Sequence, residues 1–328
     1  MESGVFLKPL RGVVIGKGSI GNRHARLLQA LLPEVDHSHV GSREADAHLD
    51  SPADSEILPP WMVGADFVIV ASPSTRHLDH LTESIRRELP VLVEKPLTSE
   101  LQDAKELVAS AKNISALIQV GYVLRFSNGY LAAKESISRR GLIGIEHVTI
   151  TAHSYLPNWR PETDYREGVS ARADLGGGVL RELSHELDYA IDVFGPLRVL
   201  SAVLARSPAI SGDVDTGAVI HAETGSGGAV TISLDMANPA LERSCEVTWR
   251  TGERLRWDLM QNSLSIRDSS GLNHHQAFPD SRDNWYENQL IAFLEAVDRK
   301  TPPSPSIHEA LLVMECIDAI ENIAGDGK

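Results

Sequence analysis

The chain has 328 residues, of which 42% are hydrophobic and 23% charged, and its formal net charge at pH 7 is −14. This length suits about two folded domains, and the negative charge argues against a nucleic-acid backbone or an anionic membrane as a partner. No apolar run approaches the roughly 18 residues of a membrane span, and the first residues lack the features of a secretory signal, so we expect a cytoplasmic protein.

A glycine-rich loop follows the first predicted strand. The apolar run 12–15 leads into Gly-Lys-Gly-Ser-Ile-Gly at 16–21, and residues 22–32 have a helical pattern. In such a strand–turn–helix the first glycine permits a tight turn, the second admits a pyrophosphate, and the third lets the helix pack on the strand. The N–H groups at the helix start then meet phosphate charge. We therefore predict dinucleotide binding, rather than an ordinary loop, at Gly16, Gly18, Ser19, Ile20 and Gly21.

The end of the second strand bears on the choice of cofactor, because an acidic residue there typically binds the ribose of NAD. Residues 39–44 read His-Val-Gly-Ser-Arg-Glu, so the strand tip presents Ser42 and Arg43, with Glu44 one step later. Arginine pairs well with phosphate, and the sequence therefore favours NADP over NAD, bound by Ser42 and Arg43. The alternative is that Arg43 is a solvated residue at a helix start.

Strands and helices continue to alternate over the first third of the chain. Strands are predicted at 66–71, 90–93 and 116–120, and helices at 76–88 and 100–112. This alternation is typical of a doubly wound parallel α/β sheet (a Rossmann fold), whose ligands bind at the carboxyl ends of the strands. Pro73, Lys95 and Tyr122 fall at such ends.

The pattern changes after residue 121. Residues 147–153 alternate polar and apolar side chains, as in a half-buried strand. Further strands are predicted near 198–206, 216–223, 228–236, 243–251, 253–259 and 262–267. Successive strands without intervening helices indicate an α+β domain with an open, mainly antiparallel sheet backed by helices. One face of this sheet is free to cover a pocket or to pair with another subunit.

A long loop, residues 154–178, follows the first predicted strand of this sheet and ends in a run of three glycines. Such a loop is a natural substrate-binding element. Trp159 and Tyr165 offer flat surfaces for a sugar ring, and arginines offer donors for a carboxylate or phosphate. These arginines are Arg125, Arg160, Arg166, Arg172 and Arg181. We hypothesise a sugar-like substrate that carries an anionic group. Because four acids share the loop, the alternative is a surface segment held by ion pairs.

The segments GKGSIGNRHARLL, ADFVIVASPSTRH, VLVEKPL and GYVLRF, in this order and spacing, resemble the Gfo/Idh/MocA family of oxidoreductases. The segment 284–324 is similar to the family's two closing helices. The resemblance implies that Lys95 acts on the reacting hydroxyl, where an ammonium can lower the hydroxyl pKa or hold an oxyanion. Alternatively, Lys95 is an ion-pair partner of Glu94. The cofactor contacts implied at these strand ends are Ser72, Pro73, His77, Glu94 and Lys95.

The run GGGVLRELSHELD at 176–188 resembles the family's glycine run and the helix that carries its catalytic histidine, which implies His185 as an acid–base group. The family's usual aspartate, four residues before the histidine, is replaced by Arg181, and Glu182 is the nearest acid. We expect Glu182, His185 and Asp188 on one helical face. The substrate contacts implied are Tyr122, Arg125, Trp159, Tyr165, Arg166, Glu182 and His185. The alternative for His185 is a buried structural role.

The resemblance implies an NAD(P)-dependent oxidoreductase that transfers a hydride between nicotinamide and a hydroxyl or keto carbon of a sugar, cyclitol, sugar acid or nucleotide sugar. Two alternatives share the fold: a lyase or glycosidase with tightly bound NAD, and a dinucleotide-binding regulator that is not an enzyme. The regulator is disfavoured because Lys95 and His185 are both present.

We expect a cofactor domain at 1–121, a substrate and oligomerisation domain at 122–306, and a helix near 307–324 that packs back on the first domain. A homodimer or homotetramer through the second sheet is implied by the resemblance. Cys245 and Cys316 lie far apart, so both are expected to be free thiols. Neither they nor the histidines have metal-ligand spacing, and no metal is expected.

Overall fold

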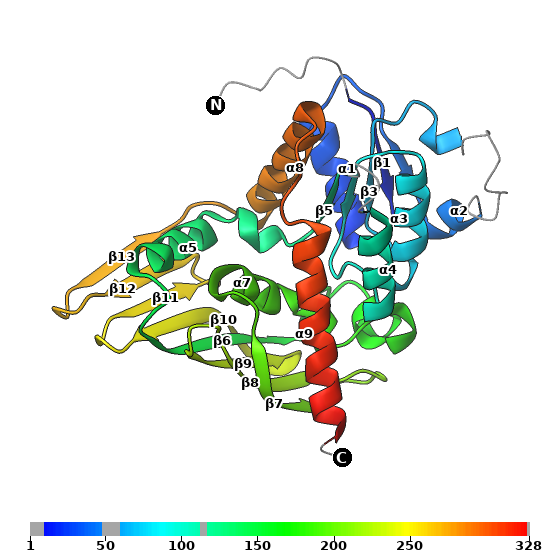
Figure 1. Ribbon diagram of the computed structural model, residues 1–328. Helices are drawn as coiled ribbons and strands as arrows, with labels where there is room; N and C mark the ends of the chain where they lie inside the picture. The colour runs from blue at the N-terminus through cyan, green and yellow to red at the C-terminus, as the bar shows by residue number, and fades with distance from the viewer. Residues whose placement is uncertain (1–9, 48–59, 112–116, 327–328) are drawn as a thin grey trace. The chain divides into compact units, whose positions relative to one another are not determined.

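The computed structural model describes residues 10–47, 60–111 and 117–326 (Figure 1). Its chain divides into two compact units, each built from two stretches of sequence. Unit 1 comprises Met1–Tyr122 and Tyr286–Leu311, and unit 2 comprises Val123–Trp285 and Leu312–Lys328.

Unit 1 contains a five-stranded parallel sheet. Its strands are β1 (Gly12–Ile15), β2 (Ser38–Val40), β3 (Phe67–Val70), β4 (Val91–Val93) and β5 (Ile118–Val120). They lie in the order β2-β1-β3-β4-β5, so the order of strands reverses between β1 and β3. All residues of β1, β3, β4 and β5 are buried, as expected of apolar strands covered on both faces. Ligands of such sheets bind at the carboxyl ends of the strands beside this reversal.

Helices cover this sheet on both sides. They are α1 (Ser19–Leu31), α2 (Ser42–Asp46), α3 (His77–Arg86), α4 (Leu101–Ala111) and, from Tyr286 onward, α8 (Arg282–Arg299), with 3₁₀ turns η1 (Pro60–Met62) and η2 (Ser74–Arg76). In Figure 1, α1 and α8 lie on one side of the sheet and α3 and α4 on the other. The ring of Phe293 on α8 meets that of Phe67 on β3 edge to face, with centroids 5.7 Å apart. This contact seals the core between α8 and the sheet.

Unit 2 contains an eight-stranded sheet. Its strands are β6 (Ile145–Tyr155), β7 (Arg198–Ala205), β8 (Gly217–Glu223), β9 (Ala229–Asp235), β10 (Ala237–Trp249), β11 (Arg254–Asp258), β12 (Ser263–Arg267) and β13 (Asn273–Ala277). Their order is β13-β12-β11-β10-β6-β9-β8-β7, with β6 and β9 parallel and the other neighbours antiparallel. Burial alternates along β8 and β9, so one face of the sheet packs inward.

Helices α5 and α7 lie on one face of this sheet (Figure 1). The helices of unit 2 are α5 (Asn128–Arg140), α6 (Val179–Glu182), α7 (Ser184–Phe194) and, from Leu312 onward, α9 (Ile307–Asp326). Its 3₁₀ turns are η3 (Val123–Phe126), η4 (Leu156–Asn158), η5 (Tyr165–Glu167), η6 (Val169–Ala171) and η7 (Ala173–Leu175). The rings of Tyr130 on α5, Tyr189 on α7 and Trp257 on β11 pack together, with centroids 5.2–6.5 Å apart.

The predicted fold class is confirmed: a parallel doubly wound sheet and a mainly antiparallel sheet backed by helices. The stretch Tyr286–Leu311 groups with the first stretch of the chain in unit 1. There Val120 donates its N–H to the carbonyl oxygen of Pro305 at 2.8 Å. Most of α9 belongs to unit 2, where Glu321 pairs with Arg181 at 2.5 Å.

Candidate functional site

The glycine loop of unit 1 packs against the end of β3. Gly16 has a φ of +115°, and a Cβ on it would stand 2.3 Å from the carbonyl oxygen of Ala71. A Cβ on Gly21 would stand 1.8 Å from the carbonyl oxygen of Gly16. Side chains are therefore excluded at both glycines, and the loop approaches β3 backbone to backbone beside the strand-order reversal.

Gly18 differs from the other two glycines. It is the N-cap of α1, and a Cβ on it would meet no described atom within 4 Å. No side chain among the described residues caps the helix, whose first turn contains Ser19, Ile20 and Gly21. An uncapped helix start with open space before it attracts a phosphate through its N–H groups and its dipole. The loop therefore fits the pyrophosphate of a dinucleotide.

The end of β2 carries both charges that bear on cofactor choice. The Glu44 carboxylate accepts from the N–H of Gly41 at 3.4 Å and lies 3.8 Å from the Lys17 ammonium. Arg43, beside Ser42 in the first turn of α2, is exposed and lines a cavity of about 650 Å³. Arg43 forms no ion pair with any residue that the structure describes, so its guanidinium is available to a phosphate.

A second arginine lines the same cavity, but acids already compensate its charge. The Arg76 guanidinium lies 2.9 Å from Asp46 and 3.0 Å from Asp79. Both acids also line the cavity. Of the two arginines that line the cavity, Arg76 is thus compensated by described acids, whereas Arg43 is not.

A chain of hydrogen bonds joins the end of β3 to α2. The Ser72 hydroxyl lies 3.0 Å from Nδ1 of His80, and Nε2 of His80 lies 3.1 Å from the Asp46 carboxylate. Burial lowers the pKa of His80, and the neutral ring then donates from Nε2 to Asp46 and accepts from Ser72 at Nδ1. The hydroxyl proton of Ser72 is thus directed inward, which leaves its oxygen as an acceptor for a ligand.

The Glu94-Lys95-Pro96 motif follows β4 directly. The peptide bond between Lys95 and Pro96 is cis. Lys95 is half-buried, whereas Glu94 is buried and its carboxylate lies 2.7 Å from Nε2 of His24 on α1. The motif is therefore joined to the helix that begins at the glycine loop.

Two residues predicted to bind ligands are enclosed by the protein. Burial lowers the pKa of His77, whose ring nitrogens lie 2.9 Å from the carbonyl oxygen of Pro96 and 3.0 Å from that of Ser72. Both ring nitrogens of His77 therefore face backbone carbonyl oxygens. Tyr122, which ends the first stretch of unit 1, is also fully buried.

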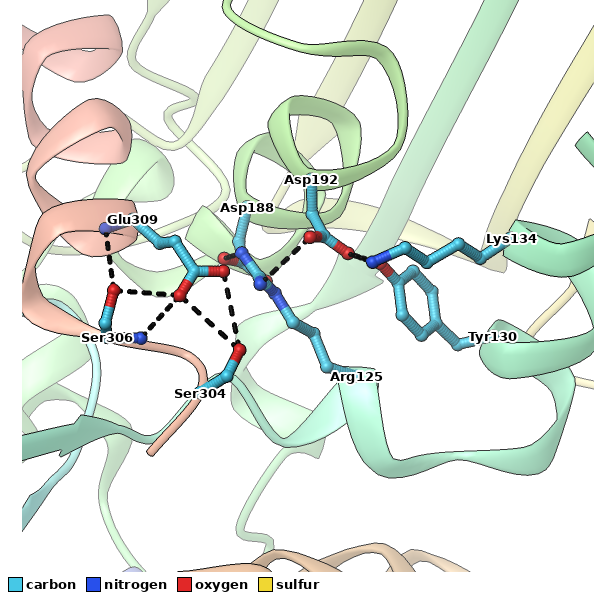
Figure 2. Close-up of polar contacts among 8 residues, drawn as sticks. All are labelled: Arg125, Tyr130, Lys134, Asp188, Asp192, Ser304, Ser306 and Glu309. Atoms are coloured by element: carbon cyan, nitrogen blue, oxygen red, sulfur yellow. Dashed lines mark hydrogen bonds and ion pairs between the residues drawn. The ribbon is translucent and has the colours of Figure 1, made fainter. Parts of the chain in front are cut away.

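In unit 2, Arg125 on η3 is held by two aspartates of α7 (Figure 2). Its Nε and Nη2 donate to Asp188 at 2.9 and 2.6 Å, and its Nη1 donates to Asp192 at 3.1 Å. Lys134 donates to Asp192 at 2.6 Å, and the Tyr130 hydroxyl also donates to it. Burial raises the pKa of Asp192, but these cations and hydrogen bonds outweigh burial and lower it. Arg125, predicted to bind substrate, thus joins η3 to α7.

His185 stands in the first turn of α7, after a break in the helix. Helix α6 ends at Glu182, and Leu183, with φ −100° and ψ 28°, separates it from α7. The single helical face expected for all three acid–base residues is therefore wrong for Glu182, which lies on α6, whereas His185 and Asp188 lie three residues apart on α7. The Glu182 carboxylate accepts from the hydroxyl of Ser170 at 2.9 Å.

The loop that was predicted to bind substrate is held by contacts within itself and to residues outside it. The indole N–H of Trp159 donates to the Ser154 hydroxyl at 3.0 Å, and the Tyr165 hydroxyl accepts from the N–H of Ser211 at 3.0 Å. Arg166 pairs with Asp164 at 2.6 Å, and its hydrogen bonds lower the pKa of that carboxyl to about 2.

Other arginines of the loop region differ in their partners. Arg172 pairs with Asp174 at 2.5 Å, and Arg181 with Glu321 at 2.5 Å. Arg160 is exposed and forms no ion pair with the described residues. The loop therefore contains the ion pairs of a surface segment together with one arginine whose charge is not compensated in this way.

His24, His80 and Asp46 were not identified from the sequence, since their partners lie 70, 8 and 34 residues away along the chain. Within the described ranges, no helix is long and apolar enough to span a membrane, and no group of three or more His, Cys, Asp or Glu side chains is placed to hold a metal ion.

Comparison with known proteins gives matches along nearly the whole chain. The family model described as an oxidoreductase family with an NAD-binding Rossmann fold, GFO_IDH_MocA, matches residues 10–122, and the model of its C-terminal alpha/beta domain matches residues 145–327. An inositol 2-dehydrogenase of Rhizobium meliloti (strain 1021) is 24% identical over 264 residues, 77% of each chain.

Two solved structures share the fold. An inositol dehydrogenase homologue from Azotobacter vinelandii, complexed with NADH and myo-inositol, superposes with a TM-score of 0.78 at 17% identity, covering 98% of this chain and 97% of that one. A levoglucosan dehydrogenase in complex with NADH and levoglucosan superposes with a TM-score of 0.81 at 16% identity, covering 98% of both chains.

Proposed function

The chain belongs to the Gfo/Idh/MocA family of NAD-binding oxidoreductases, and from this premise we propose that it transfers a hydride between nicotinamide and a hydroxyl-bearing carbon of a sugar acid or nucleotide-linked sugar. The observation that carries the proposal is the glycine loop. Two of its glycines are required by backbone packing, whereas Gly18 faces open space at a helix start. This is the arrangement that a dinucleotide needs.

We propose that Lys95 and His185 handle the proton of the reaction. A bound nicotinamide would supply the hydride acceptor for the oxidation and the hydride donor for the reduction. In the oxidation, His185 accepts the hydroxyl proton while the Lys95 ammonium stabilises the developing oxyanion. In the reduction, His185 returns that proton to the carbonyl oxygen. Glu182 is proposed to bind a hydroxyl of the substrate from the turn before His185.

An anionic substituent on the substrate is proposed to bind Arg160. The support for Arg160 is that it forms no ion pair with the described residues. The other arginines of this region, Arg166, Arg172 and Arg181, each pair with an acid. Arg160→Ala is expected to raise the KM for a sugar acid about tenfold or more and to leave the KM for the matching neutral sugar unchanged. Equal KM values for wild type and variant with the acid would contradict this assignment.

NADP is proposed as the preferred cofactor, bound by Ser42 and Arg43. The exposed guanidinium of Arg43 supports this choice, and Arg76, compensated by Asp46 and Asp79, does not add to it. Fluorescence titration should show that Arg43→Ala weakens NADPH about tenfold while NADH changes less than twofold. Glu44→Gln is the matched control at the adjacent position. Tighter binding of NADH than of NADPH by wild type would contradict the preference.

The activity itself is tested by titrating the purified protein with NADPH and NADH, followed by absorbance of the reduced nicotinamide while sugars, sugar acids and nucleotide sugars are screened. Turnover lost in Lys95→Ala and His185→Ala, with cofactor binding retained, would support the proposal. Tight cofactor binding without net oxidation or reduction would instead favour a lyase with bound NAD or a regulator. Absence of binding would overturn the assignment of the glycine loop.

We also propose that two or four copies of the chain pair through the outer face of the unit 2 sheet. Val203 on β7 lies directly opposite Val219 on β8, and these side chains are 65% and 44% exposed. Neighbouring apolar side chains exposed on strands favour association. Light scattering should give a dimer or tetramer, which Val203→Glu converts to monomer. A monomeric wild type would contradict the proposal.

A further inference from the structure

Both chain neighbours of Lys95 are held by buried histidines from different helices. The Glu94 carboxylate lies 2.7 Å from Nε2 of His24 on α1, and the carbonyl oxygen of Pro96 lies 2.9 Å from Nδ1 of His77 on α3. The two histidines are 0% and 1% exposed. Lys95 therefore stands between two residues that each contact a buried histidine.

The first contact fixes the Glu94 side chain. A carboxylate only accepts, so Nε2 of His24 carries the proton that joins them. A Cβ on Gly121, the residue after β5, would lie 2.9 Å from the other oxygen of Glu94, which shows how closely the backbone approaches the carboxylate there. The Tyr286 ring packs edge-on against His24, with centroids 5.4 Å apart. Both partners are thus confined by packing as well as by the hydrogen bond.

The second contact joins the ends of two strands. His77 faces the carbonyl oxygen of Pro96 at 2.9 Å and that of Ser72 at 3.0 Å. Carbonyl oxygens only accept, and a neutral imidazole has one N–H. The neutral ring therefore holds one strand end at a time, and the protonated ring holds both. Burial lowers the pKa of His77 and favours the neutral ring, although the nearby Glu94 carboxylate acts in the opposite direction.

We infer that His24 and His77 are positioning residues for Lys95, which set the place of its ammonium by fixing the residue on either side. This inference rests on the proposed role of Lys95. Because His24 belongs to α1, the helix whose N-cap is Gly18, the helix proposed to meet the cofactor phosphates would also position Lys95. A misplacement of about 1 Å in a reacting group can cost about 100-fold in rate.

The test compares His24→Leu and His77→Leu with His24→Gln and His77→Gln, whose amides keep a donor. The expected result is a fall in kcat of about 10- to 100-fold in the leucine variants, with partial rescue by glutamine and an NADPH Kd within about twofold of wild type. Leu107→Ala, which creates a cavity on α4, controls for general destabilisation and should leave kcat unchanged. Equal kcat values in wild type and both leucine variants would overturn the inference.

A second measurement does not depend on activity. The full-length protein with ¹³C-labelled lysine side chains is titrated by NMR, and the Lys95 signal is assigned with Lys95→Ala. The inference expects the chemical shift or the titration midpoint of Lys95 to change in the leucine variants, and an unchanged signal would overturn it. Full turnover by Lys95→Ala would refute the proposed catalytic role of Lys95 while this signal still tests its positioning. Should the leucine variants fail to fold, the glutamine variants are compared in the same titration.

Discussion

Arg125 and Asp188 form a bidentate ion pair, with donor–acceptor distances of 2.9 and 2.6 Å, between side chains that are only 7% and 1% exposed. Removing one member of a buried pair leaves the other charge without compensation, which typically costs about 3–5 kcal/mol. We therefore expect Arg125→Met to lower the free energy of unfolding by that amount in urea denaturation. Arg139→Ala, which breaks an exposed pair with Glu135, should change it by less than about 0.5 kcal/mol. A loss below about 1 kcal/mol for Arg125→Met would contradict this account.

The glycine loop allows folding and cofactor binding to be separated. In Gly21→Ala the new Cβ collides with the carbonyl oxygen of Gly16, so this variant should be strongly destabilised or fail to fold. In Gly18→Ala the Cβ meets no described atom within 4 Å, so the melting temperature should stay near that of wild type. The methyl group enters the space left for the pyrophosphate, and NADPH binding should weaken about tenfold or more. Unchanged affinity in Gly18→Ala would place the pyrophosphate elsewhere.

Stability should fall as the pH drops below about 6.5, the ordinary pKa of histidine. Burial lowers the pKa of His77 and of His80, so both stay neutral in the folded protein while they gain protons in the unfolded chain. The unfolded state then binds more protons, and each histidine contributes a loss of up to about 1.4 kcal/mol per pH unit until its folded pKa is reached. Urea denaturation between pH 7.5 and 5.5 measures the slope. His80→Gln should have a shallower slope than wild type; an identical slope would show that His80 does not take part.

Neither cysteine should react in the native protein. Burial raises the pKa of the Cys245 and Cys316 thiols to about 12, so neither supplies an appreciable amount of thiolate at neutral pH. A thiol reagent such as Ellman's should label neither site under native conditions and both after denaturation. Rapid labelling of the native protein would indicate that one of these regions opens to solvent.

The motifs that depend on neighbouring residues could be read from the sequence. At residues 16–21 and 94–96, the backbone conformation follows from the residue types of the motif itself. The apolar runs before these motifs form buried strands. The assignment of the chain to an oxidoreductase family followed from these motifs and is confirmed by the family matches. The residue roles at Lys95 and His185 remain predictions.

Contacts between distant residues could not be read in this way. The break between α6 and α7 at Leu183 could not be predicted, because no glycine or proline marks it and the sequence around it has an uninterrupted helical pattern. The apolar spacing of α5 is weak, and the strand β13 is exposed throughout, so neither was predicted. The partnership of Asp46 with His80 joins two helices that are 30 residues apart, and no local pattern indicates it.

The discontinuous make-up of unit 1 limits its use as a portable cofactor-binding module. A fragment cut after Tyr122 would lack Phe293, and the ring of Phe67 would lose its aromatic neighbour. It would also lack the carbonyl oxygen of Pro305, which accepts from Val120 on β5. An engineered stand-alone module would therefore have to join residues 286–311 to the first stretch through a designed connection.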